Sequence, residues 1–320
     1  MIALNIVSLF SGCGGLDLGF IKAGHKIIWA NDIDSDAVAT YKLNIGDHII
    51  LDDIRNIKSE EIPDCDMVIG GFPCQGFSIA NLRRTIDDER NKLYLEFYRV
   101  IRDKQPRYFV AENVKGILSL GRGKVIELIL DDFKKAGYNV KYKLLNCADY
   151  GVPQIRQRVI FIGVRIDQDN KIDFPQPTHN ENGENGLQYW VSMGEALKHI
   201  PEPDENPNIP NHVYSRYKVF SNKNFTGHRL VDPNKPSPTI LARGNGGGGV
   251  VVIHHPNNHR RLTVREAATI QTFPMDFVFI GSKTSCYRQI GNAVPPLFAE
   301  KIAKEFPIVT QPLVAIGDQL

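Results

Sequence analysis

The alternation of short apolar runs with helical stretches over the first 165 residues most restricts what this 320-residue chain can fold into. Strand-like runs lie at 6–10, 26–30, 49–51, 67–70, 107–111, 139–146 and 159–164, and helical periodicity lies at 16–23, 34–44, 93–101 and 124–135. Strands separated by helices predict βαβ units, and therefore an α/β fold with a doubly wound, mostly parallel sheet. In such a sheet, ligands bind beyond the carboxyl ends of the strands.

The alternation stops near Pro175. From there to about Arg260 the chain is rich in Pro, Asn and Gly, with short β-like runs only at 214–220, 239–242 and 250–254. Helical periodicity returns at 263–271 and 297–306. We therefore expect a catalytic, cofactor-binding domain of residues 1–172 and 258–320, and a smaller, irregular β-rich second domain of residues 173–257.

The net charge of +2 indicates no partner, but the distribution of charge does. Residues 173–205 carry seven acids and one base, whereas residues 206–262 carry eight Lys or Arg and one acid. The second stretch also holds nine Asn and five of the nine His. Such a segment suits phosphates and base edges, although the same composition is typical of a solvated polar loop.

The sequence favours neither a membrane protein nor a metal-binding protein. No apolar run approaches the roughly 20 residues that span a bilayer, and the first residues lack a basic leader region. We expect a cytoplasmic protein. The five cysteines show neither a CxxC pair nor zinc-like spacing, so we expect free thiols and no metal at positions 13, 65, 74, 147 and 286.

A Gly-rich turn, residues 10–15, follows the first strand and would let a ligand approach the backbone closely. Acids follow the next two strands. Asp32 is placed to bind ribose hydroxyls, and Asp53 to accept from an adenine amino group. Each feature is weak alone, because an acid at a strand end is often only a helix cap. Together, after three successive strands, they favour an adenosine ligand.

Four further residues are candidates for chemistry. Cys74, at the end of the fourth strand, follows Pro73 and has glycines on both sides, which suits a nucleophile presented to a cleft; the other cysteines fit small core residues. Glu112 leaves the apolar fifth strand at the same edge of the sheet. Arg156 and Arg158 are two residues apart, so on a strand they would share one face and could bind an anion or a carbonyl.

In this order, these blocks resemble the cytosine-5 DNA methyltransferase family, and in particular the compact bacterial enzymes of modification systems. The resemblance spans residues 5–165 and about 258–306. Its most specific part is Pro-Cys-Gln combined with Glu-Asn-Val. The matching blocks are residues 10–15, 73–75, 111–114, 154–158, 261–268 and 291–295.

The resemblance implies methyl transfer from S-adenosylmethionine to carbon 5 of a cytosine flipped out of double-stranded DNA at a short specific sequence. Cys74 would add to carbon 6 of the base. Glu112 would share a proton with ring nitrogen 3. Arg158 would hold the base carbonyl and support Glu112, with Arg156 assisting or binding phosphate.

By the same resemblance, Phe10 would stack on adenine while Gly12 and Gly14 pass close to the methionine part. The rest of the cofactor site would be Asp32, Asp53, Ile54, Pro73, Leu93, Asn292 and Ala293. Many members carry Glu where this chain has Asp32. Because Asp is one methylene shorter, a ribose contact there could pass to water or to Asp34.

The resemblance also implies a DNA-binding surface. Residues 76–92 would form a loop that closes on DNA, and residues 173–260 would be the target-recognition region, with a Thr-aliphatic pair at residues 239–240. Candidate DNA contacts are Ser78, Arg83, Arg84, Arg229, Thr239, Arg243 and the glycines at 244–249. We expect a monomer, with a cognate restriction endonuclease acting on the same site as a further partner.

Two alternatives stay open. One is an RNA (tRNA) cytosine-5 methyltransferase, which the basic insert at 173–260 disfavours. The other is an inactive DNA-binding homologue, which intact Cys74, Glu112 and Arg158 disfavour. A nicotinamide-dependent enzyme would leave the Pro-Cys-Gln block unexplained, and the Asn/Asp-Pro-Pro-Tyr/Phe turn of adenine methyltransferases is absent from the sequence.

Overall fold

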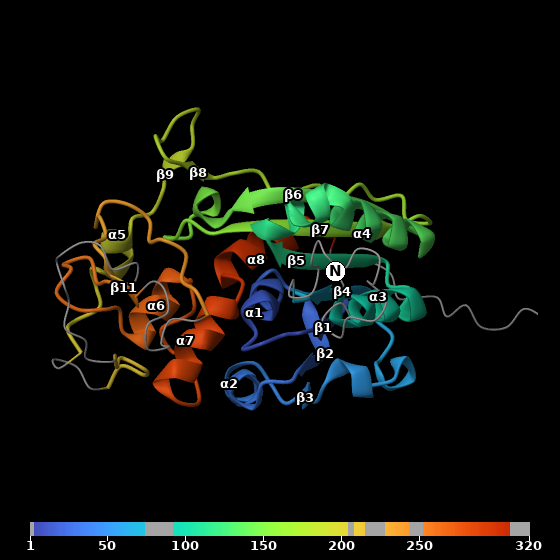
Figure 1. The fold of residues 1–320 in the computed structure, drawn as a ribbon, viewed down its shortest axis with the longest axis horizontal. Helices are drawn as coiled ribbons and strands as arrows, with labels where there is room; N and C mark the ends of the chain where they lie inside the picture. Colours follow the sequence, from blue (N-terminus) through green and yellow to red (C-terminus); the bar gives the residue numbers. More distant parts are fainter. Residues whose placement is uncertain (1–2, 74–91, 204–207, 215–227, 243–251, 308–320) are drawn as a thin grey trace, which may run out of the picture.

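The computed structural model describes residues 3–73, 92–203, 208–214, 228–242 and 252–307 (Figure 1). The described residues include a seven-stranded sheet in the order β3-β2-β1-β4-β5-β7-β6. The strands are β1 (Asn5–Leu9), β2 (Lys26–Asp32), β3 (Ile49–Leu51), β4 (Met67–Gly70), β5 (Tyr108–Val114), β6 (Tyr138–Asn146) and β7 (Gln157–Arg165).

Strands β1 to β5 are parallel, and β7 runs antiparallel between β5 and β6. The predicted mostly parallel α/β sheet is therefore confirmed. Because β1 and its neighbours β2 and β4 lie at the centre, their carboxyl ends meet at one edge with that of β5. This edge is where a ligand is expected in such a fold.

Two apolar clusters cover the two faces of the sheet. Successive strand residues alternate between them, as Ile6 and Val7 do. One cluster includes side chains from α1 (Gly15–Lys22), α2 (Ser35–Asn44) and α8 (Pro296–Ala303). The other includes side chains from α3 (Lys92–Lys104) and α4 (Lys124–Lys135). The doubly wound arrangement thus buries apolar residues on both faces.

The remaining elements lie to one side of the sheet, on the left of Figure 1. They are β8 (His179–Asn180), β9 (Gln188–Tyr189), α5 (Met193–Leu197), β10 (His228–Arg229), β11 (Val252–Ile253), α6 (Val264–Ile270) and α7 (Lys283–Asn292). A third apolar cluster unites residues from both sides of position 257, including Met193, Ile253 and Val264. The division of the chain at that position stays a prediction.

The sequence predictions for this part were less accurate. The predicted strand at 239–242 is wrong, because these residues form no strand: the Thr239 hydroxyl donates to the Ile155 carbonyl and the Ile240 amide donates to the Gln154 side chain. The strand predicted at 250–254 is described only as β11, and most of the run 214–220 lies outside the described residues. Helix α7 was not predicted. Among the described residues, no helix is both long and apolar enough to cross a membrane.

Helix α8 returns from the end of the chain to pack closely on α1. An added Cβ at Gly19 would lie 2.3 Å from Ala299 Cβ and 2.6 Å from the Glu300 amide nitrogen. Since one of these neighbours is backbone, the two helices would have to separate. Gly19 therefore permits the close contact between α8 and α1, the helix that follows the Gly-rich turn.

We predict that Gly19→Ala lowers the free energy of unfolding by about 2 kcal/mol, because overpacking outweighs the better helix propensity of Ala. Urea denaturation measures the change. Gly116→Ala is the matched control, since its added Cβ would meet only Val114 Cγ2 at 4.0 Å. An unfolding midpoint unchanged by Gly19→Ala would contradict the tight α1–α8 contact.

Candidate active site

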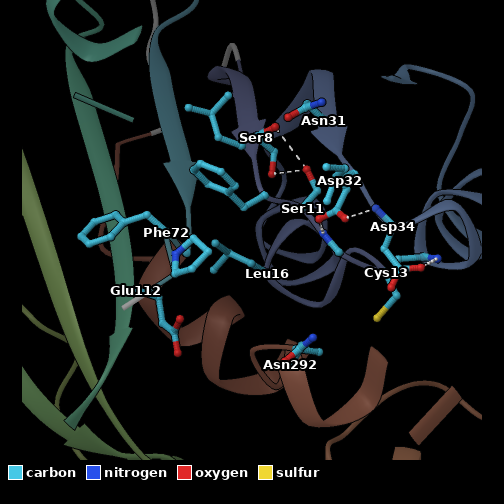
Figure 2. A pocket seen from close by; sticks show the side chains of 18 of the residues that line it. Ser8, Ser11, Cys13, Leu16, Asn31, Asp32, Asp34, Phe72, Glu112 and Asn292 are labelled. Atoms are coloured by element: carbon cyan, nitrogen blue, oxygen red, sulfur yellow. Dashed lines mark hydrogen bonds between the residues drawn. The ribbon is translucent and has the colours of Figure 1, made fainter. Parts of the chain in front are cut away.

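A cavity of about 660 Å³ opens at the carboxyl ends of β1, β2, β4 and β5. Its wall includes parts of the turn after β1, the residues that follow β2, β3 and β4, the end of β5 and the end of α7. Figure 2 shows Ser8, Ser11 and Asp32 on one side, with Phe72 and Glu112 on the other. Segments distant in sequence thus share one site.

The turn after β1 has an unusual backbone. Phe10, Gly12 and Gly14 all have positive φ, which is uncommon for a residue such as Phe10. No atom lies within 4 Å of an added Cβ at Gly12, so the space in front of that backbone is open. An added Cβ at Gly14 would instead lie 2.2 Å from Ile45 Cδ1 and 2.9 Å from Tyr41.

This geometry separates the two glycines that were predicted to approach the cofactor. Gly12 lines the cavity, whereas Gly14 is not among the residues of the wall and begins helix α1 as its N-cap. The cofactor contact of Gly14 therefore stays a prediction. Its absent side chain makes room for packing against α2 and the residue that follows it, not for a ligand.

Asp32 lies on the cavity wall, but its carboxylate is engaged. One oxygen accepts from the Gly12 amide at 2.7 Å and the other from the Asp34 amide at 2.8 Å. Burial raises the pKa of the Asp32 carboxyl above its usual value. Asp34, the alternative ribose acceptor, caps α2 and pairs with Arg288 at 2.8 Å. Asp32 thus holds the Gly-rich turn in place.

Asp53 also lines the cavity and has a cationic partner. Its carboxylate accepts from the Arg55 side chain, and these hydrogen bonds hold the pKa of the Asp53 carboxyl below its usual value. A contact with an adenine amino group would have to share this carboxylate with Arg55. The adenine role of Asp53 stays a prediction.

Nine of the ten residues predicted to hold the cofactor line this one cavity. Gly14 is the exception. The reasoning from sequence missed other residues of the wall, notably Ser8, Asp17, Ile33 and Arg288. Ile33 directly follows Asp32 and is 67% exposed. Its position just after a strand end is the one sequence signal that could have found it.

The candidate catalytic pair lies on the same wall. Arg158 Nε is 2.6 Å from Glu112 Oε1, and both side chains are close to nine-tenths buried. They come from neighbouring antiparallel strands, with Glu112 on β5 and Arg158 on β7. Arg158 Nη1 also donates to the Gln157 carbonyl at 2.8 Å, so the guanidinium is fixed where it can hold the carboxylate.

The backbone that precedes Cys74 is held against this pair. An added Cβ at Gly71 would lie 3.0 Å from Glu112 Oε2, so this position favours glycine. Asn113 Nδ2 donates to the Phe72 carbonyl at 3.0 Å. Pro73 lies on the cavity wall. Cys74 itself lies outside the described residues, as do Ser78, Arg83, Arg84 and Arg243.

Arg156 is not among the residues of the cavity wall, unlike Arg158, and the role predicted for it there stays a prediction. Its side chain is fully buried and donates to the carbonyls of Ile240, Gly291 and Ala293 at 2.8–3.0 Å. It precedes β7, so the strand geometry that would place both arginines on one face does not apply. Arg156 therefore joins its own segment to the backbone at Ile240 and to the backbone of residues 291–293.

Two predicted DNA contacts fall within the described backbone. The Thr239 hydroxyl donates to the Ile155 carbonyl at 2.7 Å, so it supports the same junction as Arg156. Arg229 lies in the short strand β10. The contacts of both residues with DNA stay predictions.

The cysteine prediction is confirmed for four thiols, since Cys13, Cys65, Cys147 and Cys286 are free and buried. Burial raises the pKa of each of these thiols, which makes them poor nucleophiles.

One group of described side chains has the proximity of a metal site, namely Glu202, His255 and His259. However, His255 Nδ1 accepts from the Asn257 amide at 3.2 Å. The carboxylate of Glu202 pairs with Arg260 at 2.8 Å. A neutral His255 must then carry its proton on the other ring nitrogen, so this group is poorly suited to a cation.

A buried carboxylate lies behind the Gly-rich turn. Asp17, in the first turn of α1, is fully buried and accepts from the Ser8 hydroxyl at 2.7 Å and the Tyr41 hydroxyl at 2.8 Å. Burial raises the pKa of Asp17 to about 6, although these hydrogen bonds oppose the increase. Its ionised form therefore costs stability at neutral pH.

We predict that Asp17→Asn is more stable than the wild type at pH 7.5, by up to about 3 kcal/mol. Because the folded state holds the Asp17 proton more tightly than the unfolded state, this gain should shrink as the pH falls from 7.5 toward 4.5. Urea denaturation at both pH values measures it. Asp169→Asn, at an exposed position, is the control. A gain independent of pH would contradict the raised pKa.

Comparisons with known proteins agree with this site. The model of the C-5 cytosine-specific DNA methylase family matches residues 4–307. Type II methyltransferase M.NgoFVII of Neisseria gonorrhoeae is 43% identical over 94% of this chain and 85% of its own. Type II methyltransferase M.BsuRI of Bacillus subtilis is 39% identical over 94% of this chain and 78% of its own.

Two solved structures have the same fold. A DNA modification methyltransferase encoded within an Escherichia coli prophage is 28% identical, with a TM-score of 0.72 over 95% of this chain and 98% of its own. The Dnmt2 methyltransferase of Schizosaccharomyces pombe is 20% identical, with a TM-score of 0.68 over 93% and 96%, and supports the fold alone. Taken with the family match, the arrangement of the cavity leads to one conclusion: the chain belongs to the C-5 cytosine-specific DNA methylase family.

Proposed function

We propose that this chain transfers a methyl group from S-adenosylmethionine to carbon 5 of a cytosine in double-stranded DNA, through a covalent adduct with Cys74. One observation carries the proposal most directly. The Glu112–Arg158 ion pair lies on the cavity wall together with Phe72 and Pro73, the two residues that precede Cys74 in the sequence. Asn113 donates to the Phe72 carbonyl and so holds this segment beside the pair. The base must leave the duplex to reach this cavity.

The chemistry requires this combination of groups. Carbon 5 of cytosine is a weak nucleophile. Addition of the Cys74 thiolate forms a bond to carbon 6 and turns the ring into an enamine, which is nucleophilic at carbon 5. Glu112 would share a proton with ring nitrogen 3, so that electron density can move into the ring. Arg158 would hold Glu112 in place and bind the base carbonyl.

The reaction then returns the enzyme to its starting state. After carbon 5 is methylated, its proton passes to a water molecule acting as base, the double bond between carbons 5 and 6 forms again, and the bond between Cys74 and carbon 6 breaks to release the thiolate. Apart from the methyl donor and this base, the steps use a thiol, a carboxyl group and a guanidinium. The proposed reaction therefore needs no metal.

The cavity fits S-adenosylmethionine as the methyl donor. The backbone at Gly12 faces open space, and the wall also offers the aromatic ring of Phe10, the carboxylates at the ends of β2 and β3, and Asn292. These residues would hold the adenosine and methionine parts. When bound, the donor supplies an electrophilic methyl group. The roles assigned to individual side chains are part of the proposal.

The names of the relatives support a place in a modification system. M.NgoFVII and M.BsuRI are both named type II methyltransferases. We propose that the chain acts as a monomer in the cytoplasm, on a short DNA sequence shared with a restriction endonuclease. The basic segment 206–262 would contact the DNA.

Bisulfite sequencing of plasmid DNA incubated with the protein and S-adenosylmethionine tests the proposal. We expect methylcytosine at one short motif. Glu112→Gln should lower the rate by about 10²-fold or more, because it removes the proton that nitrogen 3 shares. Glu127→Gln, an exposed residue of α4, is the matched control and should leave the rate unchanged.

Two results would contradict the proposal. Methyl transfer to RNA with none to DNA would place the chain among RNA methyltransferases. A fully active Cys74→Ala variant would exclude the covalent route.

A further inference from the structure

A chain of hydrogen bonds runs from the cavity into the protein beside the Gly-rich turn. The Ser11 hydroxyl donates to the Ser8 hydroxyl at 3.0 Å, and Ser8 donates to Asp17 Oδ1 at 2.7 Å. On the other side, Tyr41 donates to Asp17 Oδ2 at 2.8 Å, and the same hydroxyl is 3.0 Å from His48 Nε2. Ser8, Ser11 and Asp17 all line the cavity, and Figure 2 shows Ser8 and Ser11 beside Asp32.

Within the described residues, the carboxylate at the centre of this chain has no cationic partner. None of the ion pairs found within the described part of the chain includes Asp17. Its hydrogen-bond donors are the hydroxyls of Ser8 on β1 and Tyr41 on α2, and the nearby charged group that acts on it is the Asp32 carboxylate, which repels it. A fully buried charge without a counter-ion is costly, and such groups are concentrated at functional sites.

The proposed function supplies a counter-ion for this charge. At neutral pH, S-adenosylmethionine carries one net positive charge, because its sulfonium adds to an ammonium and a carboxylate that cancel. The product S-adenosylhomocysteine has a neutral thioether in place of the sulfonium, and its net charge is zero. A carboxylate in a buried site acts on such a charge over several ångströms without touching it.

We infer that Asp17 is a positioning and specificity residue whose buried charge makes the cavity prefer the cationic methyl donor over the neutral product. The inference rests on the proposed function. Ser8 and Tyr41 both donate to the carboxylate and so fix its place beside the Gly-rich turn. Once the methyl group has left, the attraction is lost, which favours exchange of product for new donor.

Asp17→Asn removes the charge with little change of shape. The hydroxyl of Tyr41 can accept from the new amide and donate to His48, while Ser8 donates to the amide oxygen. The matched control is Asp66→Asn. Asp66 is also buried, accepts from the Asn5 amide at 3.0 Å, and lies at the opposite end of the strands, away from the cavity wall.

Isothermal titration calorimetry at pH 7.5 with each ligand separately tests the inference. We expect Asp17→Asn to weaken binding of S-adenosylmethionine about tenfold and that of S-adenosylhomocysteine less than about twofold. Asp66→Asn should change neither affinity. The double variant Ser8→Asp with Asp17→Ser moves the carboxylate across their 2.7 Å hydrogen bond and should restore the preference for the donor.

Equal weakening of both ligands in Asp17→Asn would overturn the inference, because a purely structural role would affect both alike. If Asp17→Asn does not fold, the double variant decides, since loss of the donor preference with the charge retained would also overturn it. A wild-type protein that binds neither ligand would instead contradict the proposed function itself. The two failures are therefore distinguishable.

Discussion

The buried guanidinium of Arg156 is the interaction on which the arrangement of the site depends. It donates to three carbonyls, those of Ile240, Gly291 and Ala293. These belong to segments far apart in the sequence, and the residues at 291–293 form one wall of the cavity. Without this side chain, the buried carbonyls of Ile240 and Gly291 would lose a partner, at a cost of about 1–3 kcal/mol each.

Neighbouring amides extend the same junction. Gln154 accepts from the Ile240 amide at 3.0 Å and donates to Gln271 at 2.9 Å, and Gln271 donates in turn to the Ile290 carbonyl. The side chains of Gln154, Arg156 and Gln271 are all fully buried. The backbone at Ile240 and the end of α7 are therefore attached to the segment that precedes β7 through satisfied polar groups. The cavity depends on this attachment at the end of α7, because its wall includes Gly291, Asn292 and Ala293.

The sequence allowed good prediction wherever local rules decide position. Parallel strands end at one edge of a sheet, so the residues after β1, β2 and β4 and at the end of β5 were predicted to meet, and they line one cavity. The Glu112–Arg158 pairing was implied only by the family resemblance, and the antiparallel register of β5 and β7 is what brings the two residues together.

What the sequence could not indicate depends on tertiary packing. The different positions of Arg156 and Arg158 follow from carbonyls contributed by residues that come much later in the chain. The role of Gly14 depends on Tyr41 and Ile45 of a separate segment. Helix α7 was missed because it buries polar residues, such as Ser285 and Gln289, and so shows little apolar periodicity. In the sequence, Asp17 was one helix acid among several.

The covalent Cys74 adduct is the central claim, and trapping with 5-fluorocytosine tests it most directly. In a duplex with this base at the methylated position, fluorine occupies the place of the proton that must leave carbon 5, so β-elimination cannot release the thiol. The account predicts a one-to-one complex that survives denaturation, depends on S-adenosylmethionine and maps by peptide mass to Cys74. No complex with DNA that the enzyme otherwise methylates, or a bond to another residue, would contradict it.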